Sequence, residues 1–182
     1  MKHIHFDTES DGFYGAYWEC RGGSDCTVIA MLGDDPEDYM ARSAVKWLLR
    51  LGVNVLTMSP AKKDYSHHNY PLECIEKAIA WLKSHGSAKI GIAGASTTGT
   101  LALTAASIFD DISLTIAMTP SDFVWQGFMQ GKKDGCKECP IEGESLISYK
   151  GRPQRYMPFY YKHPDYWHTI SEESRRTGNM VA

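Results

Sequence analysis

A serine at a strand-to-helix turn is the residue of this sequence best placed for chemistry. Residues 90–103 read as a β-rich run, a turn of small residues and a helical run, with Ser96 at the turn. A serine held in a G-x-S-x-G nucleophile elbow projects its hydroxyl above the sheet and can attack a carbonyl carbon. Gly94 supplies the small residue two positions earlier, whereas Thr98 stands where the motif has its second glycine and Gly99 follows one residue late. The sequence therefore predicts a nucleophile elbow that is crowded on its helical side.

The helix after Ser96 adds a means of stabilising negative charge. Amide groups in the first helical turn favour an oxyanion, so the N–H of Thr97 is the first candidate donor. In sites of this kind the second donor comes from the loop after the third strand. That loop reads Gly33-Asp34-Asp35, and the N–H of Asp34 is the second candidate.

Two other interpretations of the turn are open. A glycine-rich strand-to-helix turn also binds phosphate groups in nucleotide-binding proteins, or has a purely structural role. Residues 90–99 contain neither G-x-G-x-x-G nor a G-K-[ST] ending. The turn also follows a third strand–helix unit, whereas a dinucleotide fingerprint occupies the first. The pattern thus favours the nucleophile.

The elements that must position Ser96 follow an alternating pattern over residues 1–120. Buried β-rich runs alternate with amphipathic helical runs, which predicts an α/β fold with a mostly parallel sheet and helices on both faces. The first two runs look antiparallel, so we expect a mixed sheet. The expected strands are 2–6, 12–20, 27–32, 53–58, 89–93 and 114–118.

The expected helices have recognisable ends. The first is predicted to be capped by Asp35 with Pro36 at its first position, and to end at Gly52. The second starts at Pro71 and ends at Gly86, and the third covers 96–109. The predicted apolar face of the first helix consists of Met40, Ala44, Trp47, Leu48 and Leu51; that of the second consists of Leu72, Ile75, Ile79 and Leu82.

The elbow and the later segment Ile116–Asp122 together resemble the α/β-hydrolase superfamily. More narrowly, they resemble the C-terminal domain of acyl-CoA thioester hydrolases and bile acid-CoA:amino acid N-acyltransferases, which are relatives of dienelactone hydrolases. The resemblance extends from about Tyr14 to Asp122. It implies an α/β-hydrolase-type sheet and a triad of nucleophile, acid and histidine in that chain order. Only Ser96 matches a triad position.

The resemblance places the acid after a seventh strand and the histidine after an eighth, and no apolar strand is apparent after Met118. We therefore expect a sheet lacking its last two strands, in a C-terminally truncated chain that forms one partial domain over 1–182. Residues 121–182 are expected to form an insertion or lid-like segment. Within them, Asp122 is a substitute candidate for the acid, and His163 and His168 are candidates for the base.

Two functions from different classes are expected from these features. The first is serine hydrolysis of small-molecule acyl-CoA thioesters or acyl esters, weak or absent in this chain because the triad is incomplete. The second is a non-catalytic hydrolase-fold module that forms homo-oligomers through an open sheet edge. Whether the chain is an enzyme stays open at this point.

Composition narrows the possible partners. The chain has 182 residues and a formal net charge of −3, with 19 Lys+Arg against 22 Asp+Glu, which gives no electrostatic case for nucleic acid or an anionic membrane. No apolar run reaches the ~18 residues of a membrane helix. The polar start of the sequence does not resemble a secretory signal, so we expect a cytoplasmic protein.

Neither a metal nor a cofactor is expected. Cys136 and Cys139 form a C-x-x-C, but Gly135 and Pro140 flank it and predict a loop rather than a redox helix. A second cysteine pair with zinc-site spacing is missing from the sequence. The pair His67-His68 is expected to lie in a solvated loop.

Overall fold

Residues 3–60, 67–130 and 138–158 are described by a computed structural model of the protein. The chain folds as two units. One comprises residues 1–60 and 71–122, and the other comprises residues 61–70 and 123–182. His163, His168 and Cys136, which the sequence singles out, lie outside the described residues.

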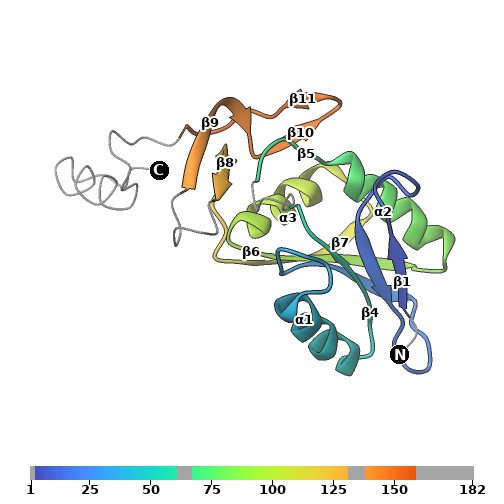
Figure 1. The fold of residues 1–182 in the computed structure, drawn as a ribbon. Helices are drawn as coiled ribbons and strands as arrows, with labels where there is room; N and C mark the ends of the chain where they lie inside the picture. The colour runs from blue at the N-terminus through green and yellow to red at the C-terminus, as the bar shows by residue number, and fades with distance from the viewer. Residues whose placement is uncertain (1–2, 61–66, 131–137, 159–182) are drawn as a thin grey trace. The chain divides into compact units, whose positions relative to one another are not determined.

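The first unit is built around a six-stranded mixed sheet (Figure 1). The two edge-side pairings, β1 with β2 and β2 with β4, are antiparallel, whereas β4, β3, β6 and β7 are parallel neighbours. The predicted mixed, mostly parallel sheet is therefore confirmed. In sheet order the strands are β1 (His3–Phe6), β2 (Gly15–Trp18), β4 (Asn54–Met58), β3 (Cys26–Met31), β6 (Lys89–Ala95) and β7 (Ile112–Met118).

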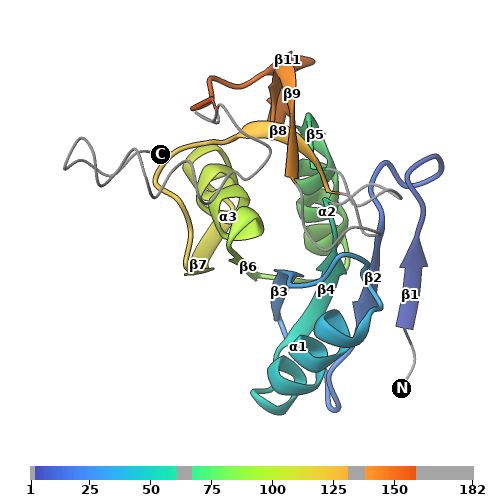
Figure 2. The ribbon, with the colours of Figure 1, turned by 60° about the vertical axis from the view of Figure 1, so that its left-hand side comes forward.

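Helices cover both faces of this sheet, as predicted. Helix α1 (Tyr39–Arg50) lies on one face, and α2 (Glu73–Ser84) and α3 (Thr97–Ile108) lie on the other (Figure 2). Successive strand residues point to opposite faces, so each strand contributes to two apolar layers. The apolar cluster between α1 and the sheet consists of Ala16, Trp18, Val28, Ala30, Val45, Leu48, Val55 and Ala93.

The predicted start of the first helix was wrong. Asp38, not Asp35, is the N-cap, and its carboxylate accepts hydrogen bonds from the amides of Ala41 and Asp34, each at 2.8 Å. The Asp35 carboxylate instead accepts from the amide of Glu37 at 2.8 Å, within the preceding turn. Aspartate at either position could cap a helix. Asp38 serves because its carboxylate accepts from an amide of the loop after β3 as well as from an amide of the helix.

The apolar face of α1 also differs from the prediction. Met40, Trp47 and Leu51 are exposed. The buried stripe is thus rotated around the helix axis relative to the predicted one. The buried residues are Ala41, Ala44, Val45 and Leu48.

The other helix ends agree better with the sequence. Gly52 and Gly86 follow α1 and α2 with φ of 76° and 89°, a conformation that glycine adopts without steric cost. Helix α2 starts at Glu73, two residues after Pro71, and it buries Ile75, Ile79 and Leu82 as predicted. No helix within the described ranges is long and apolar enough to span a membrane.

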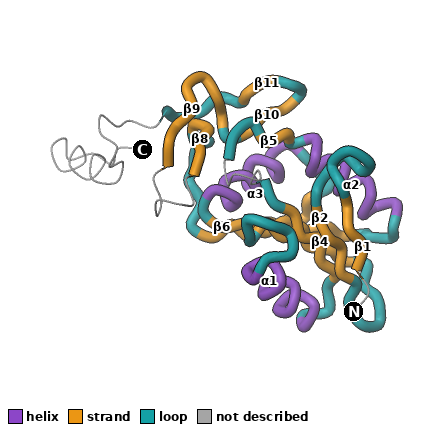
Figure 3. Tube along the Cα trace, viewed as in Figure 1, coloured by secondary structure: helices purple, strands orange, loops and turns teal. Residues whose placement is uncertain are grey.

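The second unit contains strands that the sequence did not predict. β8 (Gln126–Gln130) and β9 (Glu138–Ser145) form an antiparallel pair after Met118, where no apolar strand was apparent from the sequence, and this pair is separate from the six-stranded sheet. β5 (Tyr70–Pro71), β10 (Ile147–Tyr149) and β11 (Arg152–Pro153) form a separate three-stranded sheet. These strands are short and carry glycines and prolines, which hides the period of two. The strands and helices of both units are distinguished by colour in Figure 3.

The prediction for His67 was also wrong. Its side chain is buried, and its ring stacks on Phe128 with centroids 5.2 Å apart. The amide and carbonyl groups of the two residues exchange hydrogen bonds of 2.8 and 2.9 Å. The neighbouring His68 forms an ion pair with Glu144. A polar sequence context thus concealed an ordered strand-like pairing with β8.

Candidate functional site

Ser96 occupies a strained turn between β6 and α3. Its φ of 52° and ψ of −119° lie in a region that residues with a side chain rarely adopt. Two backbone hydrogen bonds hold it there: its amide donates to Met118 at 2.8 Å, and its carbonyl accepts from Thr100 at 3.1 Å. The side chain is exposed. Ser96 therefore presents its hydroxyl to solvent from a rigid, strained backbone.

Gly94 permits the close approach of β6 and α3. A Cβ atom at this position would lie 2.1 Å from the carbonyl oxygen of Thr98 and 2.4 Å from its carbonyl carbon. Both are backbone atoms and cannot rotate away. The glycine two residues before Ser96 is thus required by the geometry of the turn.

Thr98 occupies the position of the motif's second glycine, and Gly99, one residue later, allows the close approach of α3 to β7. The Thr98 hydroxyl accepts from the amide of Ala95 at 2.9 Å and donates to the carbonyl of Met31 at 2.5 Å. The side chain is 8% exposed, so it fills the corner rather than crowding the nucleophile. Gly99 faces β7: its Cβ would lie 3.2 Å from the Met118 carbonyl oxygen. The departure from the motif is therefore accommodated.

A glycine at position 96 should stabilise the protein. Glycine relieves the backbone strain of the left-handed conformation, and Ser96→Gly should raise the free energy of unfolding by about 1 kcal/mol. Urea denaturation followed by circular dichroism measures this change. Ser107→Gly, at an exposed position in the last turn of α3, is the control and should lower it by about 0.5 kcal/mol. Equal destabilisation by both variants would show that the turn stores no strain.

The two candidate oxyanion donors lie at the same edge of the sheet. Met31 pairs with Gly94 in the parallel register of β3 and β6, so the loop after β3 and the turn after β6 emerge together. Thr97 begins α3, and its amide belongs to the first turn, where no carbonyl of the helix is available to it. The amide of Asp34 donates to Asp38 Oδ2 at 2.8 Å. Asp34 could serve an oxyanion only after Asp38 releases this amide.

Further contacts hold the loop after β3. Ser59 Oγ donates to the Asp34 carbonyl at 2.9 Å, and the Tyr14 hydroxyl donates to Asp35 Oδ2 at 3.0 Å. Burial, and then the hydrogen bond to Asp35, raise the pKa of Tyr14 above its usual value. Tyr14 therefore stays protonated and keeps its role as donor. Neither residue was singled out from the sequence as part of the site, because both partners are distant along the chain.

No general base is hydrogen-bonded to Ser96 among the residues that the structure describes. Its Oγ makes no hydrogen bond within this part of the chain. Asp122, the candidate acid, is exposed at a bend after β7. The candidate bases His163 and His168 lie outside the described residues. A triad is thus not assembled by the described residues of the unit that carries Ser96.

The matched family is consistent with this geometry. Residues 70–164, more than half of the chain, match the family described as BAAT / Acyl-CoA thioester hydrolase C terminal. The matched range contains β6, the Ser96 turn, α3 and β7. No curated protein matches the chain. The resemblance inferred from the sequence is therefore confirmed at the level of the family.

Proposed function

Because the chain belongs to the BAAT / acyl-CoA thioester hydrolase C-terminal family, we propose that it is a serine hydrolase of acyl-CoA thioesters or acyl esters. The proposed nucleophile is Ser96. The observation that carries this proposal is the strained backbone at an exposed serine, with φ of 52° directly before a helix. Strain of this kind persists where the surroundings impose it, and it is concentrated at functional sites.

The proposed reaction is acyl transfer through a covalent intermediate. Ser96 Oγ attacks the carbonyl carbon while a base takes the hydroxyl proton, and the oxyanion accepts a hydrogen bond from the Thr97 amide. The Asp34 amide becomes the second donor once Asp38 turns aside. Collapse of the tetrahedral intermediate expels the thiolate or alkoxide, which takes the proton from the base and leaves as the thiol or alcohol. Water then hydrolyses the acyl-serine in the same way.

We expect this chain to be weakly active or inactive. A serine hydroxyl is a poor nucleophile at neutral pH without a base in hydrogen-bond reach. Ser96 Oγ has no such partner in the described part of the chain. In the proposed triad, Asp122 is the candidate acid and His163 or His168 the candidate base. Residues 121–182 are proposed to form an insertion or lid-like segment.

A fluorophosphonate probe tests the nucleophile directly. The probe phosphonylates activated serines, so we expect slow labelling of one site that peptide mapping assigns to Ser96. Ser96→Ala should abolish the label, and Ser107→Ala, which changes an exposed serine on the same helix, should not. Labelling of a residue other than Ser96 would contradict the assignment of the nucleophile, and no labelling after long incubation would favour the non-catalytic alternative.

The alternative is a non-catalytic module that self-associates through a sheet edge. The observation in its favour is β7, an edge strand whose Leu114 is 56% exposed. Edge strands with exposed apolar side chains can pair with a second copy. Sedimentation that finds a stable monomer would contradict this alternative.

A further inference from the structure

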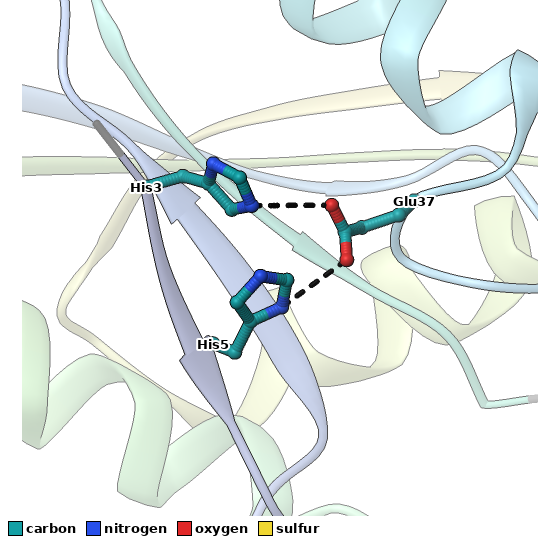
Figure 4. A group of neighbouring side chains, drawn as sticks. All are labelled: His3, His5 and Glu37. Atoms are coloured by element: carbon teal, nitrogen blue, oxygen red, sulfur yellow. Dashed lines mark ion pairs between the residues drawn. The ribbon is translucent and has the colours of Figure 1, made fainter. Parts of the chain in front are cut away.

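Two histidines and a glutamate converge beside the edge strand β1 (Figure 4). His3 and His5 are two residues apart on β1, so their side chains point to the same face of the sheet. Glu37, from the loop after β3, lies to one side of the two rings and directs one carboxylate oxygen to each. Its Oε1 is 3.3 Å from His3 Nε2, and its Oε2 is 3.1 Å from His5 Nδ1. All three residues belong to the first unit.

Neighbouring groups hold the cluster in place. The ring of His3 stacks on Trp18, with centroids 4.3 Å apart and an interplanar angle of 13°. The His5 ring packs edge-on against the His3 ring, with the two ring centroids 4.4 Å apart. Arg42 Nε donates to the Glu37 backbone carbonyl at 2.7 Å. The ligand atoms are thus positioned by packing and by the loop, before any ion arrives.

The cluster is also accessible. The side chains of His3, His5 and Glu37 are 29%, 60% and 25% exposed. An ion can therefore enter from solvent without unfolding of the strand or the loop. The remaining charge in contact with the carboxylate is the Arg42 guanidinium, 3.5 Å from Glu37 Oε1. Arg42 opposes a cation, but its side chain is 60% exposed and its charge is correspondingly screened.

The spacing of the three side chains approaches that of a tetrahedral zinc site. Zinc binds imidazole nitrogen and carboxylate oxygen at about 2.0–2.2 Å, which places neighbouring ligand atoms about 3.3–3.5 Å apart. Each histidine nitrogen lies at about this spacing from one carboxylate oxygen of Glu37, His3 Nε2 at 3.3 Å from Oε1 and His5 Nδ1 at 3.1 Å from Oε2. All three ligand atoms lie within 4.8 Å of one another. Two imidazoles and one carboxylate form a zinc ligand set that leaves one position open.

We propose that His3, His5 and Glu37 bind a zinc ion, with water as the fourth ligand. Neutral imidazole supplies the lone pair, so His3 Nε2 and His5 Nδ1 bind the ion unprotonated while the other ring nitrogen carries the proton. The ion joins the edge strand β1 to the loop that carries Asp34 and Asp38. This proposal does not depend on the hydrolase function, and it departs from the sequence-based expectation of no metal.

Titration of the full chain with Co²⁺, followed by competition with Zn²⁺, tests the site. We expect one equivalent of Co²⁺ with the visible spectrum of nitrogen and oxygen ligands. The thiolate-to-cobalt charge-transfer band should be missing, which excludes binding by the five cysteines. His5→Ala and Glu37→Gln should each weaken binding at least about tenfold, since even outer-shell changes cost 10–100-fold.

His85→Ala is the matched control. His85 is an exposed histidine on the opposite side of the sheet from α1, stacked on Trp81, and its removal should leave Co²⁺ affinity unchanged. The proposal is overturned if the chain does not bind Co²⁺, if a thiolate band accompanies binding, or if His5→Ala and Glu37→Gln bind as the unmodified chain does.

Thermal unfolding separates loss of the ion from loss of the fold. Zinc at about 100 times its Kd should raise the melting midpoint of the full chain by about 5–10 °C, because the ion binds the folded state. Glu37→Gln should lose this shift while keeping the circular dichroism spectrum of the metal-free protein. An equal shift in this variant would also overturn the proposal.

Discussion

Replacing Ser96 with alanine should reduce the hydrolysis of acyl-CoA thioesters to the rate of a solution without protein. The Ser96 hydroxyl is the atom proposed to attack the carbonyl carbon, and the variant has no group that could form the acyl intermediate. In hydrolases with a complete triad, removal of the serine lowers kcat by about 10⁶-fold. Release of free CoA thiol measures the rate. If the unmodified chain hydrolyses the thioester slowly, the largest decrease that can be measured is set by the rate of hydrolysis without protein.

Ser107→Ala is the control for this experiment, because it removes a serine from the exposed side of the same helix. Its rate should equal that of the unmodified chain. Hydrolysis that survives in Ser96→Ala would contradict the assignment of the nucleophile.

The rate of the unmodified chain reports a different property, the presence of a base. No hydrogen bond reaches Ser96 Oγ within the described residues, so we expect slow turnover. Rapid, Ser96-dependent turnover would indicate that a base does reach it. His163→Ala and His168→Ala would then identify which of the two candidate histidines serves, through selective loss of activity.

Gly94→Ala should destabilise the protein by about 3 kcal/mol or more. The added Cβ would lie 2.1 Å from the Thr98 carbonyl oxygen, so β6 and α3 must separate. Overpacking of a core costs about 1–3 kcal/mol when side chains can adjust, and here the obstructing atoms are backbone. Chemical denaturation followed by circular dichroism measures the loss. Labelling of Ser96 by the fluorophosphonate should be lost as well, because the turn can no longer hold its geometry.

Gly91→Ala on the same strand provides a matched control. A Cβ at Gly91 would meet its nearest atom at 3.4 Å, which is ordinary van der Waals contact. We expect this variant to change stability by less than about 1 kcal/mol. Similar destabilisation by both variants would contradict the close approach of strand and helix at Gly94.

Features that depend on a few neighbouring residues were predictable from the sequence. Gly52 and Gly86 end helices because glycine adopts a positive φ at little cost. Small residues around Ser96 allow a sharp turn between an apolar strand and a helix, and this local steric requirement identified the candidate nucleophile. The alternation of buried strands and amphipathic helices likewise determined the class of fold.

Features that depend on partners distant along the chain were not predictable. Asp38 rather than Asp35 caps α1 because its carboxylate also holds the amide of Asp34 in the loop. Thr98 fits the turn because its hydroxyl reaches the carbonyl of Met31, on a neighbouring strand. These outcomes follow from the geometry at the end of β3, which the local sequence does not specify.

The sequence by itself thus determined the turn that carries Ser96, because the small residues that allow this turn are its neighbours along the chain. Only the tertiary structure decided which distant residues contact each side chain. The strand order places β1 next to β2. Glu37 thereby contacts His3 and His5, which lie more than thirty residues before it in the chain. The physical reason is that backbone preferences act over one turn or strand, whereas side-chain partners are selected by the packing of whole elements.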